Sequence, residues 1–144
     1  MQLPAIQSCE AEDRQDIIDG INAYNLSHVP AMGEMSTPID LVLKDEEGQV
    51  IGGLLGFIGY WKILEIKVLW VDEAWRGHGL GSKLMLHAEE MARSQGAKLS
   101  TVDTIDFQAE EFYPKLGYQV FGELENFPEG HRRIFFQKRL GEDA

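Results

Sequence analysis

The pattern of apolar positions predicts three helices along the chain. Apolar side chains recur at helical spacing over residues 13–27, although Gly20 weakens the pattern there. The helical period returns over residues 80–91, and Gly96 is placed to end this second helix. A third helix is predicted over residues 106–116, where apolar side chains again share one face.

Strand-like patterns fill most of the remaining chain. Alternating or continuous apolar runs predict six strands, over residues 39–44, 49–58, 64–71, 98–102, 118–124 and 134–140. The residues between them are rich in Gly, Pro and acidic side chains, as turns and loops are. The order is helix, three strands, helix, strand, helix and two strands. We therefore expect an α+β (mixed α/β) fold with a six- to seven-stranded mixed sheet, built as a single domain over residues 1–144.

Composition narrows the class of protein further. Of the 144 residues, 44% are hydrophobic and 26% are charged, which is typical of a globular domain. No apolar stretch approaches the ~20 residues that a membrane-spanning helix needs, and the amino terminus lacks the pattern of a secretory signal. Cys9 has no second cysteine to pair with, which fits a reducing compartment. We expect a cytoplasmic protein with no membrane partner.

The formal net charge of −11 bears on the partners. Phosphate backbones are bound by clustered Lys and Arg, so we expect no nucleic-acid partner. An acidic surface permits cationic partners such as amines. The alternative, that the charge only keeps the protein soluble, stays open at this point.

The segment that points to chemistry is Arg76-Gly77-His78-Gly79-Leu80-Gly81, between a predicted strand and a predicted helix. Glycines let the backbone turn tightly and approach a ligand without a Cβ in the way. The first turn of a helix presents unpaired N–H groups and partial positive charge. A glycine-rich entry to a helix is therefore a pocket suited to phosphate.

Other glycine-rich loops fit these residues less well. A P-loop has Lys followed by Ser or Thr after its last Gly, whereas here Ser82 precedes Lys83. A dinucleotide fingerprint has the spacing G-x-G-x-x-G directly after the first strand. Here the spacing is G-x-G-x-G in mid-chain, although Asp103 lies at a suitable distance for the acidic residue of that motif. A glycine-rich turn with no ligand is the remaining alternative.

Two signatures resemble those of the GNAT acetyltransferases. In that family the loop has Arg or Gln, two residues, Gly, one residue, then Gly or Ala, and Arg76, Gly79 and Gly81 match it. Residues 106–118 resemble the second signature, commonly Asn-x-x-Ala-x-x-Phe-Tyr-x-Lys-x-Gly-Phe. The chain departs from it at Asp106, which stands in place of Asn. The element order over residues 10–140 also resembles the family.

The resemblance implies a GNAT fold in which strands 64–71 and 98–102 part at their carboxyl ends as a V. Acetyl-CoA, the cosubstrate, would lie in the V and would need no metal ion. Backbone N–H groups of the glycine-rich loop would hold its pyrophosphate, and the backbone of Leu69 and Val71 would pair with the pantetheine. The cofactor-binding residues implied in this way are Leu69, Trp70, Val71, Arg76, Gly77, His78, Gly79, Leu80, Gly81, Ser82, Asp106 and Gln108.

The resemblance also suggests roles in acyl transfer. Tyr113 is expected to be the general acid that protonates the departing thiolate, and the alternative is a core tyrosine. Glu65 is a candidate base, directly or through water, and the alternative is a solvated carboxylate paired with Lys67. The backbone N–H of Leu69 could stabilise the oxyanion. Because an ionised Asp cannot donate a hydrogen bond, Asp106 could simply cap its helix and Gln108 could donate instead.

The expected reaction is the transfer of the acetyl group from acetyl-CoA to a primary amine, which we expect to belong to a small molecule. The acceptor site should be built by residues 25–38, 59–63 and 125–133, because such loops vary most within a fold. Two alternatives stay open: a CoA-binding module without turnover, and an acyltransferase with another donor or acceptor. Edge strands near the carboxyl end could pair two copies into a homodimer.

Overall fold

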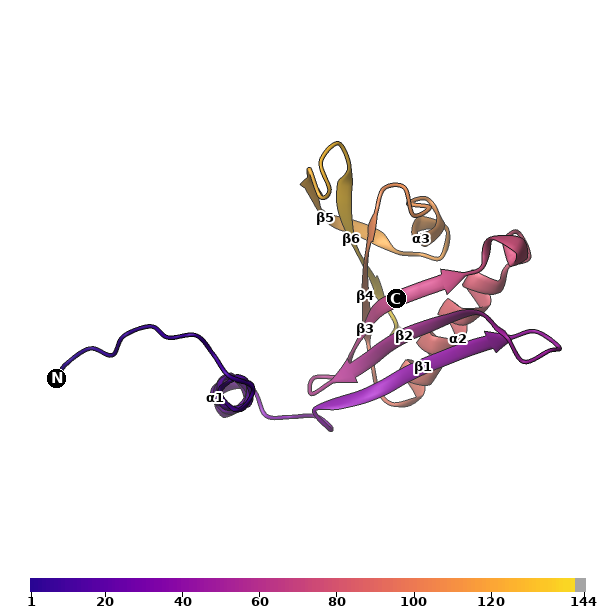
Figure 1. Ribbon diagram of the computed structural model, residues 1–144. Coiled ribbons are helices and arrows are strands. Elements are labelled where there is room, and N and C mark those ends of the chain that lie inside the picture. The colour runs from indigo at the N-terminus through magenta and orange to yellow at the C-terminus, as the bar shows by residue number, and fades with distance from the viewer. Residues whose placement is uncertain (142–144) are drawn as a thin grey trace. The chain divides into compact units, whose positions relative to one another are not determined.

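The computed structural model describes residues 1–141 and divides into two compact units, one of Met1–Ala31 and one that begins at Met32 (Figure 1). The smaller unit contains one helix, α1 (Ala11–His28). A capping box starts α1, because the Glu10 side chain accepts from the helix backbone and Asp13 accepts from the Glu10 N–H. The predicted first helix is confirmed. That the whole chain forms a single domain stays a prediction.

The larger unit is built on one six-stranded sheet, as the strand patterns predict. The spatial order is β1-β2-β3-β4-β6-β5, and only β3 and β4 run parallel among the described strands. The strands are β1 (Ser36–Lys44), β2 (Val50–Gly59), β3 (Ile63–Val71), β4 (Leu99–Ile105), β5 (Gln119–Glu125) and β6 (Arg132–Arg139). The mixed α+β class with its mixed sheet is therefore confirmed.

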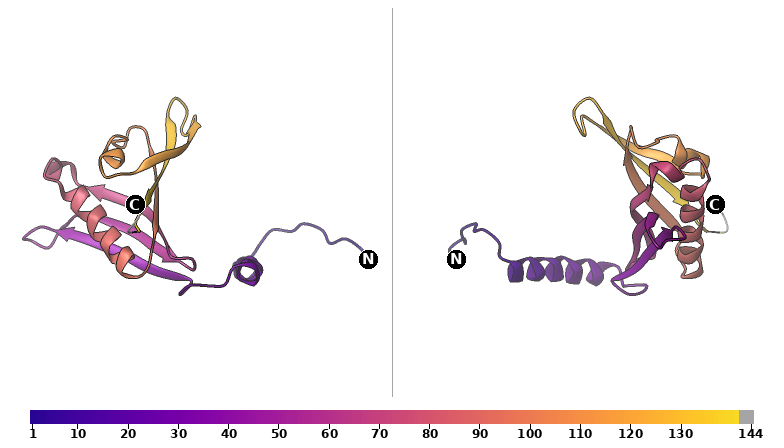
Figure 2. Two further views of the ribbon diagram at one scale, coloured as in Figure 1. Left: turned by 180° about the vertical axis from the view of Figure 1, so that it is seen from behind. Right: turned by 45° about the vertical axis from the view of Figure 1, so that its right-hand side comes forward.

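The sheet opens where β3 and β4 stop pairing. Their parallel ladder ends at the pair Ile66 and Val102, after which β3 continues along β2 and β4 continues along β6. At the same point the register of β2 and β3 shifts, leaving Lys67 as an extra residue on β3. Such a bulge bends its strand and increases the local twist. Figures 1 and 2 show the two arms diverging, which confirms the expected V.

The bulge also changes which side chains of β3 face the core. Before it, Leu64 and Ile66 are buried; after it, Leu69 and Val71 pack against the same core. Strict alternation would have placed Val68 and Trp70 there, but these are 47% and 45% exposed. A one-residue insertion moves every following side chain to the opposite face. The same insertion therefore opens the sheet and decides which side chains in the carboxyl half of β3 face the core.

Helix α2 (Leu80–Ser94) covers one face of β1, β2 and β3 (Figure 2). Its buried stripe includes Leu84, Met85, Ala88 and Ala92, at the helical spacing that the sequence shows. Burying such a stripe against a sheet is the main source of stability for a helix of this length. The amino-terminal end of α2 is thereby fixed at the mouth of the V.

A buried polar network ties α2 to the far half of the sheet. The Glu89 carboxylate is 1% exposed and accepts from the Tyr118 hydroxyl at 2.9 Å and from Lys138 Nζ at 2.7 Å. Because Tyr118 donates to Glu89, the Ser100 hydroxyl at 2.8 Å donates to Tyr118. Each charged group in this network has a partner. Removal of one partner would leave a buried charge uncompensated.

We expect Glu89→Ala to lower the free energy of unfolding by about 3–5 kcal/mol, because Lys138 would remain largely buried without its carboxylate. Urea denaturation monitored by circular dichroism measures this loss. Glu90→Ala is the matched control, since Glu90 is exposed and only pairs with Arg93 one turn away. Its cost should stay within about 0.5 kcal/mol. Equal costs for the two variants would contradict a structural role for the network.

The helix predicted from Asp106 is wrong in its extent. Only α3 (Phe112–Lys115) is helical, and residues 106–111 form turns in which Ala109 has a φ of 56°. Pro114 gives one reason, because a proline inside a helix clashes with the carbonyl four residues earlier and is tolerated only in the first turn. Gln108 gives another, because its side-chain oxygen accepts from the nearby Ile105 N–H and so competes with helical hydrogen bonding.

Candidate active site

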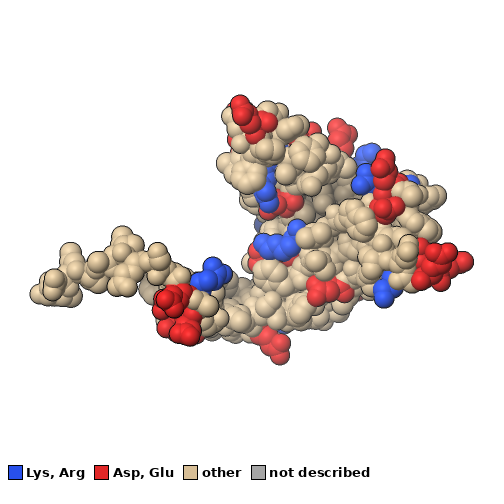
Figure 3. All heavy atoms as spheres, viewed as in Figure 1, with Lys and Arg blue, Asp and Glu red and all other residues tan. Residues whose placement is uncertain are grey.

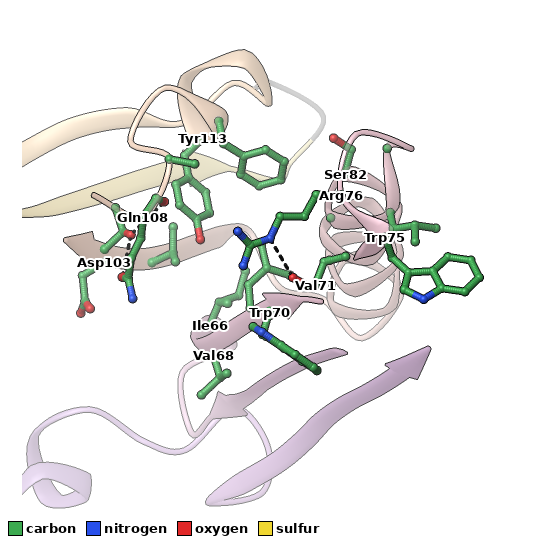
Figure 4. Close-up of a pocket in the computed structure, with 18 of the residues that line it drawn as sticks. Ile66, Val68, Trp70, Val71, Trp75, Arg76, Ser82, Asp103, Gln108 and Tyr113 are labelled. Atoms are coloured by element: carbon green, nitrogen blue, oxygen red, sulfur yellow. Dashed lines mark hydrogen bonds between the residues drawn. The ribbon is translucent and has the colours of Figure 1, made fainter. Parts of the chain in front are cut away.

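A cleft of about 910 Å³ lies where β3 and β4 part (Figure 4). Its walls come from β3, the loop and first turn of α2, β4, the turn that follows β4, and α3. The lining residues are 66–71, 75–77, 79–82, 102–104, 107–109, 112 and 113. The residues that the two sequence signatures single out therefore meet at one site, although more than 20 residues of chain separate them.

All of the predicted site residues except Glu65, His78 and Asp106 line this cleft. Glu65 lies on β3 opposite Phe57, and its carboxylate is 3.5 Å from Lys67 Nζ, with both side chains partly exposed. The alternative that we gave for Glu65, an ion pair with Lys67, is therefore present in the structure. A part for Glu65 in the reaction stays a prediction.

Asp106 is engaged outside the cleft. Its carboxylate accepts from the Arg132 backbone N–H at 3.0 Å and from His131 Nδ1 at 2.8 Å. Burial acts to raise the pKa of Asp106, but these hydrogen bonds and the nearby positive charges hold it below its ordinary value. Asp106 thus fixes the turn after β4 to the start of β6 and does not cap α3. Its predicted contact with the cofactor has no support in this geometry.

Gln108 lies on the same turn and does line the cleft (Figure 4). Its side-chain oxygen accepts from the Ile105 N–H at 3.2 Å and from the Thr104 hydroxyl at 3.1 Å. Both bonds use the amide oxygen, so the NH₂ group is the donor that Gln108 could offer a ligand. The structure therefore favours Gln108 over Asp106 as the polar contact from the second signature.

The glycine-rich loop forms a concave entry to α2. Gly79 is the N-cap of α2 with a φ of 75°, a conformation that disfavours side chains with a Cβ. A Cβ at Gly79 would meet nothing within 4 Å, so the space in front of the loop is open. A Cβ at Gly81 would lie 3.3 Å from Phe112 Cζ, so Gly81 allows α2 to pack closely on α3. Leu80, Gly81 and Ser82 of the first turn of α2 line the cleft, and the unpaired N–H groups of a helix start suit a phosphate.

Arg76 lies with its side chain folded toward the cleft (Figure 4). Its Nε donates to the Val71 carbonyl at 3.0 Å. The carbonyl that was expected to pair with a pantetheine therefore has a side-chain partner in this structure.

The residues that line the cleft include few charged side chains, and these carry both signs. Lys67 and Arg76 are its cations and Asp103 is its carboxylate. Figure 3 shows basic side chains at the hollow of the larger unit with acidic side chains beside them. The protein has a net charge of −11, but the cleft lining carries charged side chains of both signs, so an anion bound there would need directed N–H groups and Arg76.

Tyr113 supplies a neutral phenol to the cleft. It lies on α3, is 6% exposed, and packs against Tyr118 and Phe136 while its hydroxyl points into the cavity (Figure 4). Burial, and then the charge of Asp103, raise the pKa of Tyr113 to about 12. The phenol therefore keeps its proton throughout the physiological range and can donate it.

Sequence reasoning missed Asp103 as a member of the site. The predicted strand stopped at Val102, whereas β4 continues to Ile105 and carries Asp103 into the cleft. A polar residue directly after the predicted end of a central strand was the available signal. Phe112 packs against the core and also lines the cleft.

Comparison with known proteins decides the family. The family model described as "Acetyltransferase (GNAT) family" matches residues 10–118. The chain belongs to this family. It is 43% identical over 96 residues to a blasticidin-S acetyltransferase of Streptomyces morookaense, and the matched residues cover 66% of this chain and 70% of that protein. It is 32% identical over 133 residues to acetyltransferase Atu2258 of Agrobacterium fabrum, covering 91% and 93%.

Solved structures agree with the GNAT assignment. The crystal structure of an acetyltransferase from Bacillus cereus superposes with a TM-score of 0.87 at 36% identity, covering 94% of this chain and 97% of that one. The V-shaped sheet described above is therefore the fold of an acetyltransferase. Within residues 1–141, no three His, Cys, Asp or Glu side chains are grouped to hold a metal ion. No helix in that range is long and apolar enough to cross a membrane.

The raised pKa of Tyr113 predicts how this GNAT-family protein responds to alkali. A phenol whose pKa is higher in the folded state stabilises that state fully below pH 10, and the contribution is lost as the pH rises toward 12. Tyr118 acts in the same direction, chiefly because it is buried. We expect the free energy of unfolding to fall between pH 10 and 12, by at most about 1.4 kcal/mol per pH unit for each group.

Urea denaturation at a series of pH values measures this slope. Tyr113→Phe should flatten it, because the variant has no phenol to ionise at this buried position. Tyr24→Phe, which removes an exposed phenol, is the control and should leave the slope as in the wild type. A slope that is the same in all three proteins would show that Tyr113 ionises equally easily in the folded and unfolded chains.

Proposed function

We propose that this GNAT-family protein transfers the acetyl group of acetyl-CoA to a primary amine of a small molecule. One observation carries the proposal: a glycine-rich helix entry and a buried neutral phenol line the same cleft between parted strands. A diphosphate held at one end of this cleft would place an acyl group between the arms of the V. The family supports the acyl transfer, and the geometry supports where it occurs.

Binding of the donor would rest on the loop rather than on overall charge. The N–H groups of Gly77 and of the first turn of α2 would hold the pyrophosphate, with Arg76 adding a positive charge. The exposed edge of β3 after Ile66 offers Leu69 and Val71 to the pantetheine amides. The bound cosubstrate would supply an activated thioester, and the loop and the β3 edge would orient it.

Transfer would need a neutral amine, because a protonated amine has no lone pair to attack with. A Lys-like amine has a pKa of about 10.4, so about one molecule in a thousand is neutral at pH 7. As the C–N bond forms, the backbone N–H of Leu69 would stabilise the oxyanion. As the C–S bond breaks, Tyr113 would protonate the departing sulfur and regain a proton from the acylated nitrogen. Because Glu65 does not line the cleft, any part that it takes as a base would run through water.

A small-molecule acceptor is supported by the relatives. The relative that is 43% identical over two thirds of this chain is named for the acetylation of blasticidin S, a small molecule. The direct test is a panel of small amines screened for release of CoA from acetyl-CoA. Tight binding of acetyl-CoA with no thiol released by any amine would contradict the proposed function.

We expect Gly79→Val to weaken acetyl-CoA binding by more than about tenfold, because a branched Cβ would fill the open space in front of the loop. Isothermal titration calorimetry measures the loss. Gly48→Val is the matched control: Gly48 also has a positive φ, of 83°, and open space around its Cβ, but it lies in the turn between β1 and β2. Both variants carry similar backbone strain. Wild-type affinity in Gly79→Val would refute the loop assignment.

We expect Tyr113→Phe to reduce kcat by about 10²-fold with little change in KM for acetyl-CoA, as the loss of a general acid does. Steady-state kinetics with the best amine of the panel measure both constants. The ring packing against Phe136 is retained in the variant, so the change isolates the hydroxyl. An unchanged kcat would remove Tyr113 from the mechanism.

A further inference from the structure

Asp103 is the carboxylate of the cleft lining. It lies on β4 between the buried Val102 and Thr104, opposite Phe135 of β6. The lining cations, Lys67 and Arg76, come from β3 and from the loop after it, on the other arm of the V. Arg76 belongs to the glycine-rich loop where the phosphates are expected, Lys67 directly follows the last β3–β4 pair and forms an ion pair with Glu65, and Asp103 lies on the opposite arm.

Asp103 shares its arm with Tyr113. Both side chains line the cleft, and the charge of Asp103 is a smaller cause, after burial, of the raised pKa of Tyr113. Figure 4 shows Asp103 at the end of the cavity away from Ser82 and Trp75, with Tyr113 and Arg76 between them. A group bound by Asp103 would thus lie away from the glycine-rich loop, on the far side of the expected general acid.

The present partner of Asp103 is itself a cation. Arg133 Nη2 donates to Asp103 Oδ1 at 2.6 Å, and both side chains are about one-third exposed. Partly exposed ion pairs contribute little net stability, so this one can be exchanged at small cost. Arg133 also lies 4.7 Å from the centre of the Phe127 ring, a second favourable position for a guanidinium. Arg133 does not line the cleft, whereas Asp103 does.

We propose that Asp103 binds a cationic group of the acceptor and makes the enzyme prefer acceptors that carry a second positive group besides the amine to be acetylated. The reacting amine must be neutral, and a carboxylate would hold it protonated, so Asp103 is suited to a different cation of the same molecule. The acceptor cation would take the place of Arg133 at the carboxylate. This inference rests on the proposed function and deepens it by naming a substrate class.

The test compares α,ω-diamines with n-alkylamines of equal length, from three to eight carbons, by release of CoA. The wild type should show a higher kcat/KM with a diamine than with its monoamine. Asp103→Asn should lower kcat/KM for the preferred diamine by about 10- to 100-fold, mainly through KM, because a hydrogen bond to a charged group is lost. The monoamine should change by less than about threefold. Lack of a diamine preference in the wild type, or an equal loss with both amines, would overturn the inference.

Arg133→Met separates recognition from a structural role. This variant removes the same ion pair but keeps the carboxylate, so the diamine KM should stay unchanged or fall. A loss equal to that of Asp103→Asn would show that the pair only supports the fold. Calorimetry with acetyl-CoA should give wild-type affinity for both variants, and a weakened affinity would place Asp103 in the donor site instead. Release of no CoA with any amine would contradict the proposed function itself.

Discussion

The parallel strands β3 and β4 are hydrogen-bonded to each other over four residue pairs only, from Ile63 and Leu99 to Ile66 and Val102. A sheet in which these strands stayed paired would have no cleft, since side chains and backbone would fill the space between them. The extra residue at Lys67 bends β3 away, and each strand keeps a partner on its other side. The backbone groups that β4 no longer satisfies then become the wall of the site. The cleft therefore forms where the ladder between β3 and β4 is interrupted. The pairing of β3 with β2 and of β4 with β6 keeps it open.

The charge of the protein sets a second constraint. An acidic chain that binds an anionic cosubstrate must do so with local, oriented dipoles, because its overall field opposes the ligand. The start of α2 meets this need, and the burial of α2 against β1, β2 and β3 keeps it in place. The opposite arm carries Asp103 and the neutral phenol of Tyr113. In the proposed function, one cleft would thus join a loop that holds the anionic cosubstrate to an arm whose carboxylate suits a cationic acceptor.

Polar clusters away from the chemistry hold these parts in position. Glu89, Tyr118 and Lys138 join α2 to the strands beyond the opening of the sheet. Asp106 and Arg132 join the turn after β4 to β6, and this turn brings Gln108 to the cleft. In both clusters the charged groups are matched by partners, as buried or half-buried charges need to be. Residues of the second GNAT signature therefore differ in position: Gln108 and Tyr113 line the cleft, and Asp106 supports the turn that carries Gln108.

Most of the helices and strands and the glycine-rich loop are predictable from the sequence, because they depend on local periods and on residue chemistry. The apolar stripe of α2, the alternation of the strands and the glycines from Gly77 to Gly81 are local signals. Pro114 also limits α3 locally, although the face shared by Ala109 and Tyr113 suggested a longer helix. Tertiary structure alone decided which residues meet. The bulge at Lys67 depends on pairing with β2, the partner of Asp106 lies 26 residues away at Arg132, and Asp103 reaches the cleft only because β3 bends away from β4. Such contacts join distant parts of the chain, and no local period encodes them.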